Sequence, residues 1–399
     1  MLQAFQDAVP ILDKIEEAGF EAYFVGGSVR DYLLKKEIDD VDIATSATPE
    51  EIKCIFQKTI DVGIEHGTVI VLYNGKTYEV TTFRSESNYV DFRRPKDVTF
   101  IRSLYEDLKR RDFTMNAIAM DRFGKVIDPF NGHSDIKRKL IQTVGKAEER
   151  FSEDALRMMR AVRFVSQLSF DIEIDTFAAL RQFGPLLMNI SIERKTKEFE
   201  KLLTGKNRNK ALEILLKAEL NAFLPGLKDE EKAIRKTIAY SLSHLKLTEM
   251  WTILLFTLNL SVKESKILLK EWKLSNQKIK EIEKISNFLS KRFLQNWSKV
   301  AIYQSGIEVS MSVERIYNVI NGIQMEEQID KLKSLYNELP IKELGDLVVT
   351  GQDIMNWNMK PGGPWVKELL MKIEQEVLLG NILNEKEAIR EWQTTCNPK

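Results

Sequence analysis

The sequence predicts an α+β protein, with a mixed sheet and helices in the N-terminal part and helices alone in the rest. Between about residue 20 and residue 130, short β-branched and aromatic runs alternate with helical stretches and turns, as at residues 67–73 and 77–84. After about residue 145, apolar residues recur three and four positions apart, as at residues 155–168, and strand signals almost vanish. Pro and Gly at 223–230 and 350–364 are the expected interior breaks.

Composition limits the possible classes of protein. The 399 residues, 43% of them hydrophobic, are enough to bury one or more cores. Lys plus Arg and Asp plus Glu both number 59, so only local basic patches can argue for a nucleic-acid partner. Cys54 and Cys396 lie far apart and favour a reduced cytoplasmic protein over a disulfide framework or a zinc site. No apolar run approaches the roughly 20 residues that span a membrane, and residues 1–20 indicate an amphipathic helix rather than a signal peptide.

A glycine turn at the end of a predicted strand is the first candidate site. Gly26, Gly27 and Ser28 precede Arg30 and a predicted helix. Glycines let the backbone approach an anion, and the N–H groups of the turn and the Arg30 guanidinium supply hydrogen-bond donors and positive charge. A triphosphate fits this arrangement, although a plain Gly-Gly turn explains the segment by itself equally well.

A pair of carboxylates follows the glycine turn. Asp40 and Asp42 alternate with Val41 in a β-type run, so period-two geometry places both carboxylates on one face of the strand. Two Mg²⁺ ions held there could activate a hydroxyl and stabilise a leaving pyrophosphate. A solvated loop is the more common explanation of an Asp-x-Asp pair alone. The combination with a glycine turn is much more specific.

These segments resemble the nucleotidyltransferase superfamily related to DNA polymerase β, and within it the class II tRNA CCA-adding enzymes and the bacterial poly(A) polymerases. The resemblance covers the first 210 or so residues densely and the remainder weakly. It implies a polymerase-β-like head at 1–145, a base-recognising helical neck at 146–210, and a tRNA-binding body at 211–300 and tail at 301–399. It also implies a third metal carboxylate, for which Glu79 is the matching residue; a cross-strand ion pair explains Glu79 equally well.

Further segments match family motifs. The resemblance assigns Arg111 to the phosphates and Asp112 to the ribose of the nucleotide, roles that suit a guanidinium fork and a carboxylate. Asp128 and Gly132 match a motif that joins head to neck, and we interpret both as structural. The polar stretch 84–107 matches the family's flexible loop, which is expected to help the site change from C to A.

The most informative segment, residues 151–164, predicts a helix with Ser152 as its N-cap. Asp154 and Arg157 lie three positions apart and are therefore expected to be adjacent on its surface. Cytosine and adenine both present an exocyclic amino donor beside a ring-nitrogen acceptor, so one carboxylate and one guanidinium can accept both bases and reject uracil and guanine. The segment matches the family's EDxxR motif, which is assigned this role; a surface salt bridge is the alternative. Arg160 and Arg163 follow at the same spacing of three residues and are two more candidate nucleotide-binding residues.

The expected function is template-independent addition of CCA to the 3′ end of tRNA from CTP and ATP, with Mg²⁺ as cofactor. A poly(A) polymerase, an enzyme that adds only CC or only A, and a non-catalytic RNA-binding homologue are the alternatives. The acceptor arm and elbow of tRNA are the expected contacts. Residues 194–210, with seven basic and two acidic residues, are a candidate phosphate track, although a solvated helix face explains them equally well. We interpret His66, His133 and His244 as structural. The sequence does not distinguish a monomer from a homodimer.

Overall fold

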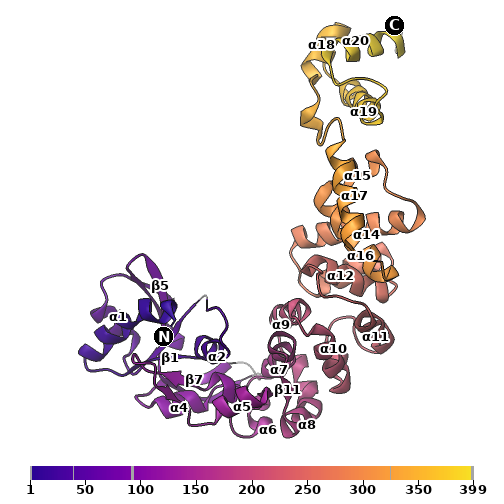
Figure 1. Ribbon diagram of the computed structural model, residues 1–399. Coiled ribbons are helices and arrows are strands. Elements are labelled where there is room, and N and C mark those ends of the chain that lie inside the picture. Colours follow the sequence, from indigo (N-terminus) through magenta and orange to yellow (C-terminus); the bar gives the residue numbers. More distant parts are fainter. Residues whose placement is uncertain (1, 39, 91–93, 324, 397–399) are drawn as a thin grey trace. The chain divides into compact units, whose positions relative to one another are not determined.

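The computed structural model describes residues 2–38, 40–90, 94–323 and 325–396. The chain folds as two compact units, residues 1–231 and 232–399 (Figure 1). Within the described residues, the main sheet lies in unit 1 and unit 2 is helical. The α+β class is confirmed.

Unit 1 is built on a mixed sheet of seven described strands in the order β3-β4-β5-β2-β1-β8-β9. The strands are β1 (Ala22–Val25), β2 (Asp42–Thr45), β3 (Thr59–Gly63), β4 (Thr68–Tyr73), β5 (Lys76–Thr82), β8 (Ala119–Met120) and β9 (Val126–Ile127). β2 is antiparallel to β1 and parallel to β5, so Asp42 has Val25 and Glu79 as its register partners. The turn that follows Val25 therefore lies beside two acidic positions of the sheet.

Short helices accompany this sheet: α1 (Gln3–Glu17), α2 (Gly27–Leu33), α3 (Pro49–Ile55), α4 (Leu104–Lys109) and the 3-10 turns η1 (Ile64–His66) and η2 (Thr114–Asn116). The predicted amphipathic first helix is confirmed. Its apolar face packs on the sheet, where the Phe5 and Phe24 ring centroids lie 4.8 Å apart. α3 begins with a capping box in which Thr48 and Glu51 bond each other's backbone N–H groups.

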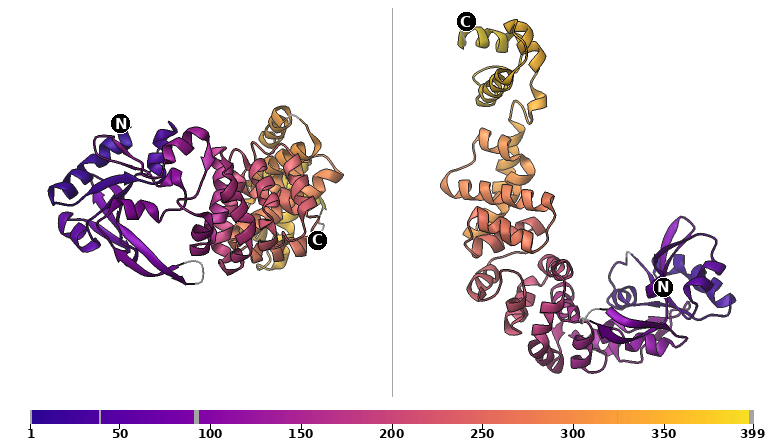
Figure 2. Two further views of the ribbon diagram at one scale, coloured as in Figure 1. Left: turned by 90° about the horizontal axis from the view of Figure 1, so that it is seen from below. Right: turned by 180° about the vertical axis from the view of Figure 1, so that it is seen from behind.

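A separate two-stranded antiparallel sheet forms from the stretch that the sequence matched to a flexible loop. Its strands are β6 (Arg84–Val90) and β7 (Arg94–Phe100), and residues 91–93 between them lie outside the described residues. The left view of Figure 2 shows the two strands as a long hairpin at the edge of the head. The backbone N–H of Ile101 donates to the carbonyl of Phe83 at 2.9 Å, so the hairpin is closed at its base.

The remainder of unit 1 is mainly helical: α5 (Gly132–Arg138), α6 (Ala147–Glu153), α7 (Leu156–Leu168), α8 (Ile174–Phe183), η3 (Gly184–Asn189), α9 (Ile192–Thr204), α10 (Arg208–Lys217) and η4 (Leu220–Phe223). Two short parallel strands, β10 (Leu140–Ile141) and β11 (Asp171–Ile172), were not expected from the sequence. α7 is central, because its apolar residues, such as Met158 and Val162, are fully buried and it packs against α9 and α10.

The prediction of one helix over residues 151–164 was wrong. α6 ends at Glu153 and α7 begins at Leu156, and Asp154 between them has an extended backbone with φ −134° and ψ 102°. Ser152 lies inside α6 and therefore is not an N-cap. Oδ1 of Asp154 instead accepts a hydrogen bond from the N–H of Leu156 at 3.0 Å, so it satisfies a backbone donor at the start of α7.

Gly132, interpreted as structural, stands where no other residue fits. A Cβ at this position would lie 2.1 Å from the carbonyl oxygen of Thr114. Asp128 fixes the same turn, because its carboxylate accepts from the N–H groups of Gly132 and His133, both at 2.8 Å. The contact thus sets the distance between α5 and η2.

We expect Gly132→Ala to lower the free energy of unfolding by about 3 kcal/mol, because either α5 or η2 must shift to admit the methyl group. Urea denaturation measures this change. Gly63→Ala is the control, since its Cβ would have no atom within 4 Å, and it should stay within about 0.5 kcal/mol of the parent. Equal stability of the two variants would contradict the close contact.

Unit 2 consists, in its described part, of helices: α11 (Glu231–Ala239, whose first residue ends unit 1), α12 (Leu247–Thr257), α13 (Val262–Glu271), α14 (Asn276–Leu294), α15 (Lys299–Ser305), α16 (Ile307–Asn321), α17 (Met325–Asn337), η5 (Leu344–Asp346), α18 (Gly351–Asn358), α19 (Pro364–Leu379) and α20 (Lys386–Cys396). Trp251 and Trp272 are fully buried and meet edge to face with centroids 5.2 Å apart. A second core around Ile354, Ile373 and Ile389 joins α18, α19 and α20. None of the helices in the described residues is long and apolar enough to cross a membrane.

Candidate active site

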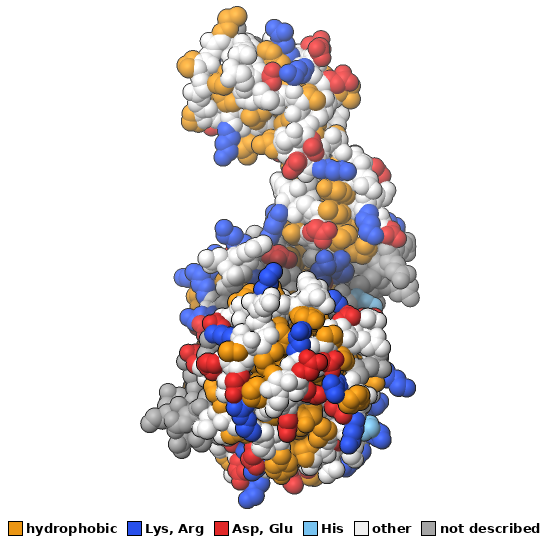
Figure 3. Space-filling view, turned by 90° about the vertical axis from the view of Figure 1, so that its left-hand side faces the viewer, with side chains coloured by type: hydrophobic (Ala, Val, Ile, Leu, Met, Phe, Trp, Pro, Cys, Tyr) orange, Lys and Arg blue, Asp and Glu red, His pale blue; other side chains and the backbone are white. Residues whose placement is uncertain are grey.

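A cavity of about 990 Å³ lies within unit 1 and is lined by residues of the sheet, α2, α7 and α9. Its charged lining comprises nine basic and four acidic side chains: Arg30, Arg84, Arg110, Arg111, Arg157, Arg160, Arg163, Arg194 and Lys201, with Asp42, Glu79, Asp112 and Asp154. On the face drawn in Figure 3, basic and acidic side chains are interspersed. The cavity lining has an excess of basic side chains instead, which suits a polyanionic ligand.

Ten of the twelve predicted site residues line this cavity, and the other two, Ser28 and Asp40, do not. Gly27 lines it directly after Gly26, whose φ of 71° is the left-handed conformation that favours glycine. A Cβ on Gly26 would also lie 3.2 Å from Nη1 of Arg111. The buried Ser28 hydroxyl donates to the Val25 carbonyl at 2.9 Å, so its place is inside the turn.

Asp42 and Glu79 reach the cavity from the adjacent parallel strands β2 and β5. Burial, with repulsion from Glu79, raises the pKa of Asp42 to about 6, against the opposing attraction of Arg111. Two carboxylates with this mutual repulsion are a donor set that fits a hard divalent cation.

Asp40 is placed differently from the prediction. β2 begins at Asp42, so Asp40 precedes the strand and is exposed, although its charge contributes to the raised pKa of Asp42. The described residues contain no group of three or more Asp, Glu, His or Cys side chains with the geometry of a metal site. Metal binding by Asp40, Asp42 and Glu79 stays a prediction.

Arg111 is held at the cavity by a buried carboxylate. Its Nη2 donates to Asp107 at 3.1 Å and its Nη1 to the carbonyl of Asn116 at 3.3 Å. Asp107 also accepts from Arg110 at 2.7 Å and from the backbone N–H of Arg84 at 3.3 Å. Burial alone would raise the pKa of Asp107, but Arg110 and Arg111 outweigh burial and lower it. Asp107 therefore joins the hairpin to both arginines.

Asp112 is buried beside α7. Its Oδ2 lies 2.7 Å from Nε and 2.5 Å from Nη2 of Arg160, and its Oδ1 accepts from Nδ2 of Asn116 at 3.0 Å. Burial by itself would raise the pKa of Asp112, but the charge of Arg160 and these hydrogen bonds lower it to about 2. The carboxylate is ionised at neutral pH and links the head to α7.

This pKa gives a stability prediction. Because the folded pKa is below the ordinary value of 3.8, Asp112 contributes stability above pH 4 that is lost as the pH falls through the folded value. We expect this group to account for a loss of about 2 kcal/mol between pH 4 and pH 2. Urea denaturation across that range should show a shallower pH dependence for Asp112→Asn than for the parent, and parallel curves would contradict the assignment.

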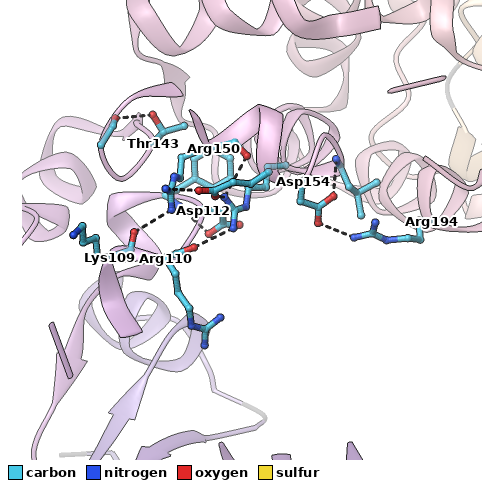
Figure 4. Close-up of polar contacts among 12 residues, drawn as sticks. Lys109, Arg110, Asp112, Thr143, Arg150, Asp154 and Arg194 are labelled. Carbon is cyan, nitrogen blue, oxygen red and sulfur yellow. Dashed lines mark hydrogen bonds and ion pairs between the residues drawn. The ribbon is translucent and has the colours of Figure 1, made fainter. Parts of the chain in front are cut away.

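Asp154 and Arg157 both line the cavity, and each is held by a charged side chain of unit 1. Oδ2 of Asp154 accepts from Nη2 of Arg194 at 2.7 Å, and Figure 4 shows the two side chains pointing toward one another. Arg157 donates to Glu153 at 2.5 Å and to the carbonyl of Arg110 at 3.0 Å. These contacts tie Asp154 to α9, and Arg157 to α6 and to the backbone of Arg110.

Three arginines surround one buried ring. The guanidinium carbons of Arg30, Arg160 and Arg163 lie 5.2, 5.6 and 4.1 Å from the centroid of the Phe164 ring. Arg163 also lies 3.2 Å from Glu198, and burial lowers its pKa to about 10 although Glu198 opposes this. Cation–π contacts of this kind orient guanidinium groups that would otherwise repel one another.

The predicted phosphate track at 194–210 holds only in part. Lys195 is buried and its Nζ donates to the carbonyls of Leu187 and Phe223, both at 3.1 Å. Arg208 is buried as well, and Lys210 pairs with Asp171. Lys195 therefore links η3 to η4 instead of facing a phosphate.

Several cavity residues were not among the predicted site residues: His66, Arg84, Asn116, Phe164 and Gln167. Phe164 and Gln167 follow Arg160 at helical spacing, and this periodicity could have indicated them. His66 was interpreted as structural, yet it lines the cavity and its carbonyl accepts a hydrogen bond from Arg84. The contact between His66 and Arg84 depends on the position of the hairpin, so no pattern in the nearby sequence predicts it.

The head and its basic cavity place the chain among the nucleotidyltransferases, and family models agree. The model described as "Poly A polymerase head domain" matches residues 22–142. The model described as "Probable RNA and SrmB- binding site of polymerase A" matches residues 169–231, and "tRNA nucleotidyltransferase domain 2 putative" matches residues 244–393. Together these matches extend over most of both units.

Relatives narrow the class. The chain is 49% identical to a CCA-adding enzyme of Geobacillus sp. (strain WCH70), covering 98% of this chain and 97% of the relative. It is 47% identical to a CCA-adding enzyme of Bacillus cereus (strain Q1), covering 99% and 100%. The crystal structure of the Bacillus stearothermophilus CCA-adding enzyme in complex with CTP matches with a TM-score of 0.91 and 47% identity, covering 100% of this chain and 98% of that one. The chain belongs to the CCA-adding enzyme family.

Proposed function

We propose that the protein adds CCA to the 3′ end of tRNA, using CTP and ATP and releasing pyrophosphate. The observation that carries this proposal is the full-length identity of 49% to a CCA-adding enzyme, together with a cavity that gathers ten of the twelve predicted site residues. Because tRNA is the substrate, we place the reaction in the cytoplasm.

In this proposal the carboxylates of the sheet hold Mg²⁺. Asp42 and Glu79 face each other across β2 and β5, and Asp40 is the further candidate next to them. Divalent ions, when bound, supply activation of the attacking 3′-hydroxyl and stabilise the charge of the leaving pyrophosphate. Arg111 lies between the glycine turn and Asp107, where its guanidinium meets a triphosphate that approaches Gly26. Arg30, on the same side of the cavity, supplies a second guanidinium.

Asp154 and Arg157 read the base in this proposal. A carboxylate accepts from the amino group of C or A, and a guanidinium donates to the adjacent ring nitrogen. Since Arg194 and Glu153 hold these two side chains in the structure, a bound base must replace those contacts with hydrogen bonds of its own. Uracil and guanine present a carbonyl and an N–H in reversed positions, so they would leave buried charges unpaired.

Incorporation of labelled CTP and ATP into tRNA that lacks its 3′ end tests the function. The expected result is addition of two C and one A in the presence of magnesium. Addition of A alone would move the assignment to an A-adding enzyme or a poly(A) polymerase, and addition of C alone to a CC-adding enzyme. Binding of tRNA without incorporation of either nucleotide would support the non-catalytic homologue.

A further inference from the structure

Asn116 connects the two halves of the cavity through its side-chain amide. It ends η2, is only 7% exposed, and lines the cavity. Its Oδ1 accepts from Nη1 of Arg30 on α2 at 2.8 Å, and its Nδ2 donates to Oδ1 of Asp112 at 3.0 Å. Arg30 follows the glycine turn, and Asp112 carries the ion pair to α7.

The chemistry of these partners fixes the direction of the amide. An arginine has no acceptor and an ionised carboxylate has no donor, so the oxygen of Asn116 must face Arg30 and its nitrogen must face Asp112. An aspartate would place two acceptors there and repel Asp112, and a leucine of similar size would satisfy neither partner. Both requirements are met at once by an amide of this length.

The contacts form one continuous series across unit 1. Arg30 is fixed on its far side by Asp31 at 2.8 Å, and Asp112 is fixed by Arg160 at 2.7 Å. Arg30 and Arg160 also share the Phe164 ring. A shift of Arg30 toward an anion therefore changes the hydrogen bond that orients Asp112, and through it the side chain of Arg160.

We propose that Asn116 is a positioning residue that couples the phosphate-side arginine Arg30 to Arg160 on α7, the helix that also carries the base-reading Arg157. The proposal rests on the roles given to Arg30 and Arg157 under the proposed function, and on Arg160 as a predicted nucleotide-binding residue next to Arg157. Its consequence is that triphosphate binding and base reading are not independent. The Asn116 amide links the position of Arg30 to the position of Arg160 and does not itself contact the reacting atoms.

A double-mutant cycle measures this coupling. kcat/KM for CTP is determined for Arg30→Ala, Arg160→Ala and the double variant, first in the parent and then with Asn116→Leu. In the parent we expect the loss of kcat/KM in the double variant to differ by about 10-fold from the product of the losses in Arg30→Ala and Arg160→Ala, because the two side chains belong to one network. With Asn116→Leu the non-additivity should fall to within about twofold.

The matched control is Asn221→Leu. Asn221 is buried to the same degree, at 8% exposed, and its Nδ2 donates to the carbonyl of Leu227 at 3.0 Å away from the cavity. This variant should lower the melting temperature but keep the 10-fold coupling. If Asn116→Leu does not fold, Asn116→Ser replaces it, since the smaller residue breaks both contacts without filling the space.

Coupling that stays near 10-fold in the Asn116 variants would overturn the proposal, as would complete additivity in the parent. Failure of the underlying function is recognised separately, because the parent would then incorporate neither CTP nor ATP. A change in the KM for CTP together with a change in the discrimination between CTP and UTP is the second expected signature. A variant that affects only the melting temperature would reduce Asn116 to a purely structural residue.

Discussion

Asp42→Asn should lower kcat for CTP and ATP incorporation by about three orders of magnitude, which corresponds to about 4 kcal/mol of transition-state stabilisation. The amide keeps the size of the side chain and removes the charge that would hold a cation. Relief of the repulsion between Asp42 and Glu79 should leave the fold intact or slightly more stable. Single-turnover assays with tRNA that lacks its 3′ end measure the loss, and tRNA binding should change within a small factor.

Asp61→Asn is the control for this experiment. Asp61 lies on β3 of the same sheet, is exposed, and pairs with Lys53 at 2.8 Å outside the cavity. This variant should retain full turnover. Parallel measurements on Asp40→Ala and Glu79→Gln decide which carboxylate completes the site. Turnover within tenfold of the parent for Asp42→Asn would remove the carboxylate site from the mechanism.

Base selection should change most in Asp154→Asn. An amide can donate to the carbonyl of uracil or guanine where the carboxylate can only accept, so discrimination of CTP against UTP should fall by about 100-fold. The total rate with CTP should fall less than the discrimination. Competition between CTP and UTP in one reaction gives the ratio directly.

Asp171→Asn serves as its control, because Asp171 pairs with Lys210 in the same unit away from the cavity. Arg157→Ala tests the second residue of the base-reading pair. This variant should lower the incorporation of both CTP and ATP and also lower the discrimination of both against UTP. Unchanged discrimination in both variants would refute reading of the base by the protein.

The sequence predicts the head because its determinants are local. Alternating runs predicted strands such as β4 and β5, and the glycine turn and Asp42 predicted the carboxylate side of the cavity. Asp154 could not be placed, because periodicity continues through residues 151–164 whereas an Arg194 forty positions away holds the carboxylate. Asn116 was missed for the same reason, since its partner Arg30 is 86 positions away. Polar contacts between residues far apart in the chain produce no periodic pattern in the sequence from which they could be predicted.

The pairing of β2 with β5 has a consequence for how such a site survives sequence change. Neighbouring strands lie about 4.8 Å apart, a distance that peptide hydrogen bonds set whatever the side chains are. The backbone hydrogen bonds between β2 and β5 therefore set the distance between Asp42 and Glu79. Substitutions on the protein surface do not change this distance. A shift of β5 by a single residue, however, would turn Glu79 to the opposite face and separate the two carboxylates although both acids are still present.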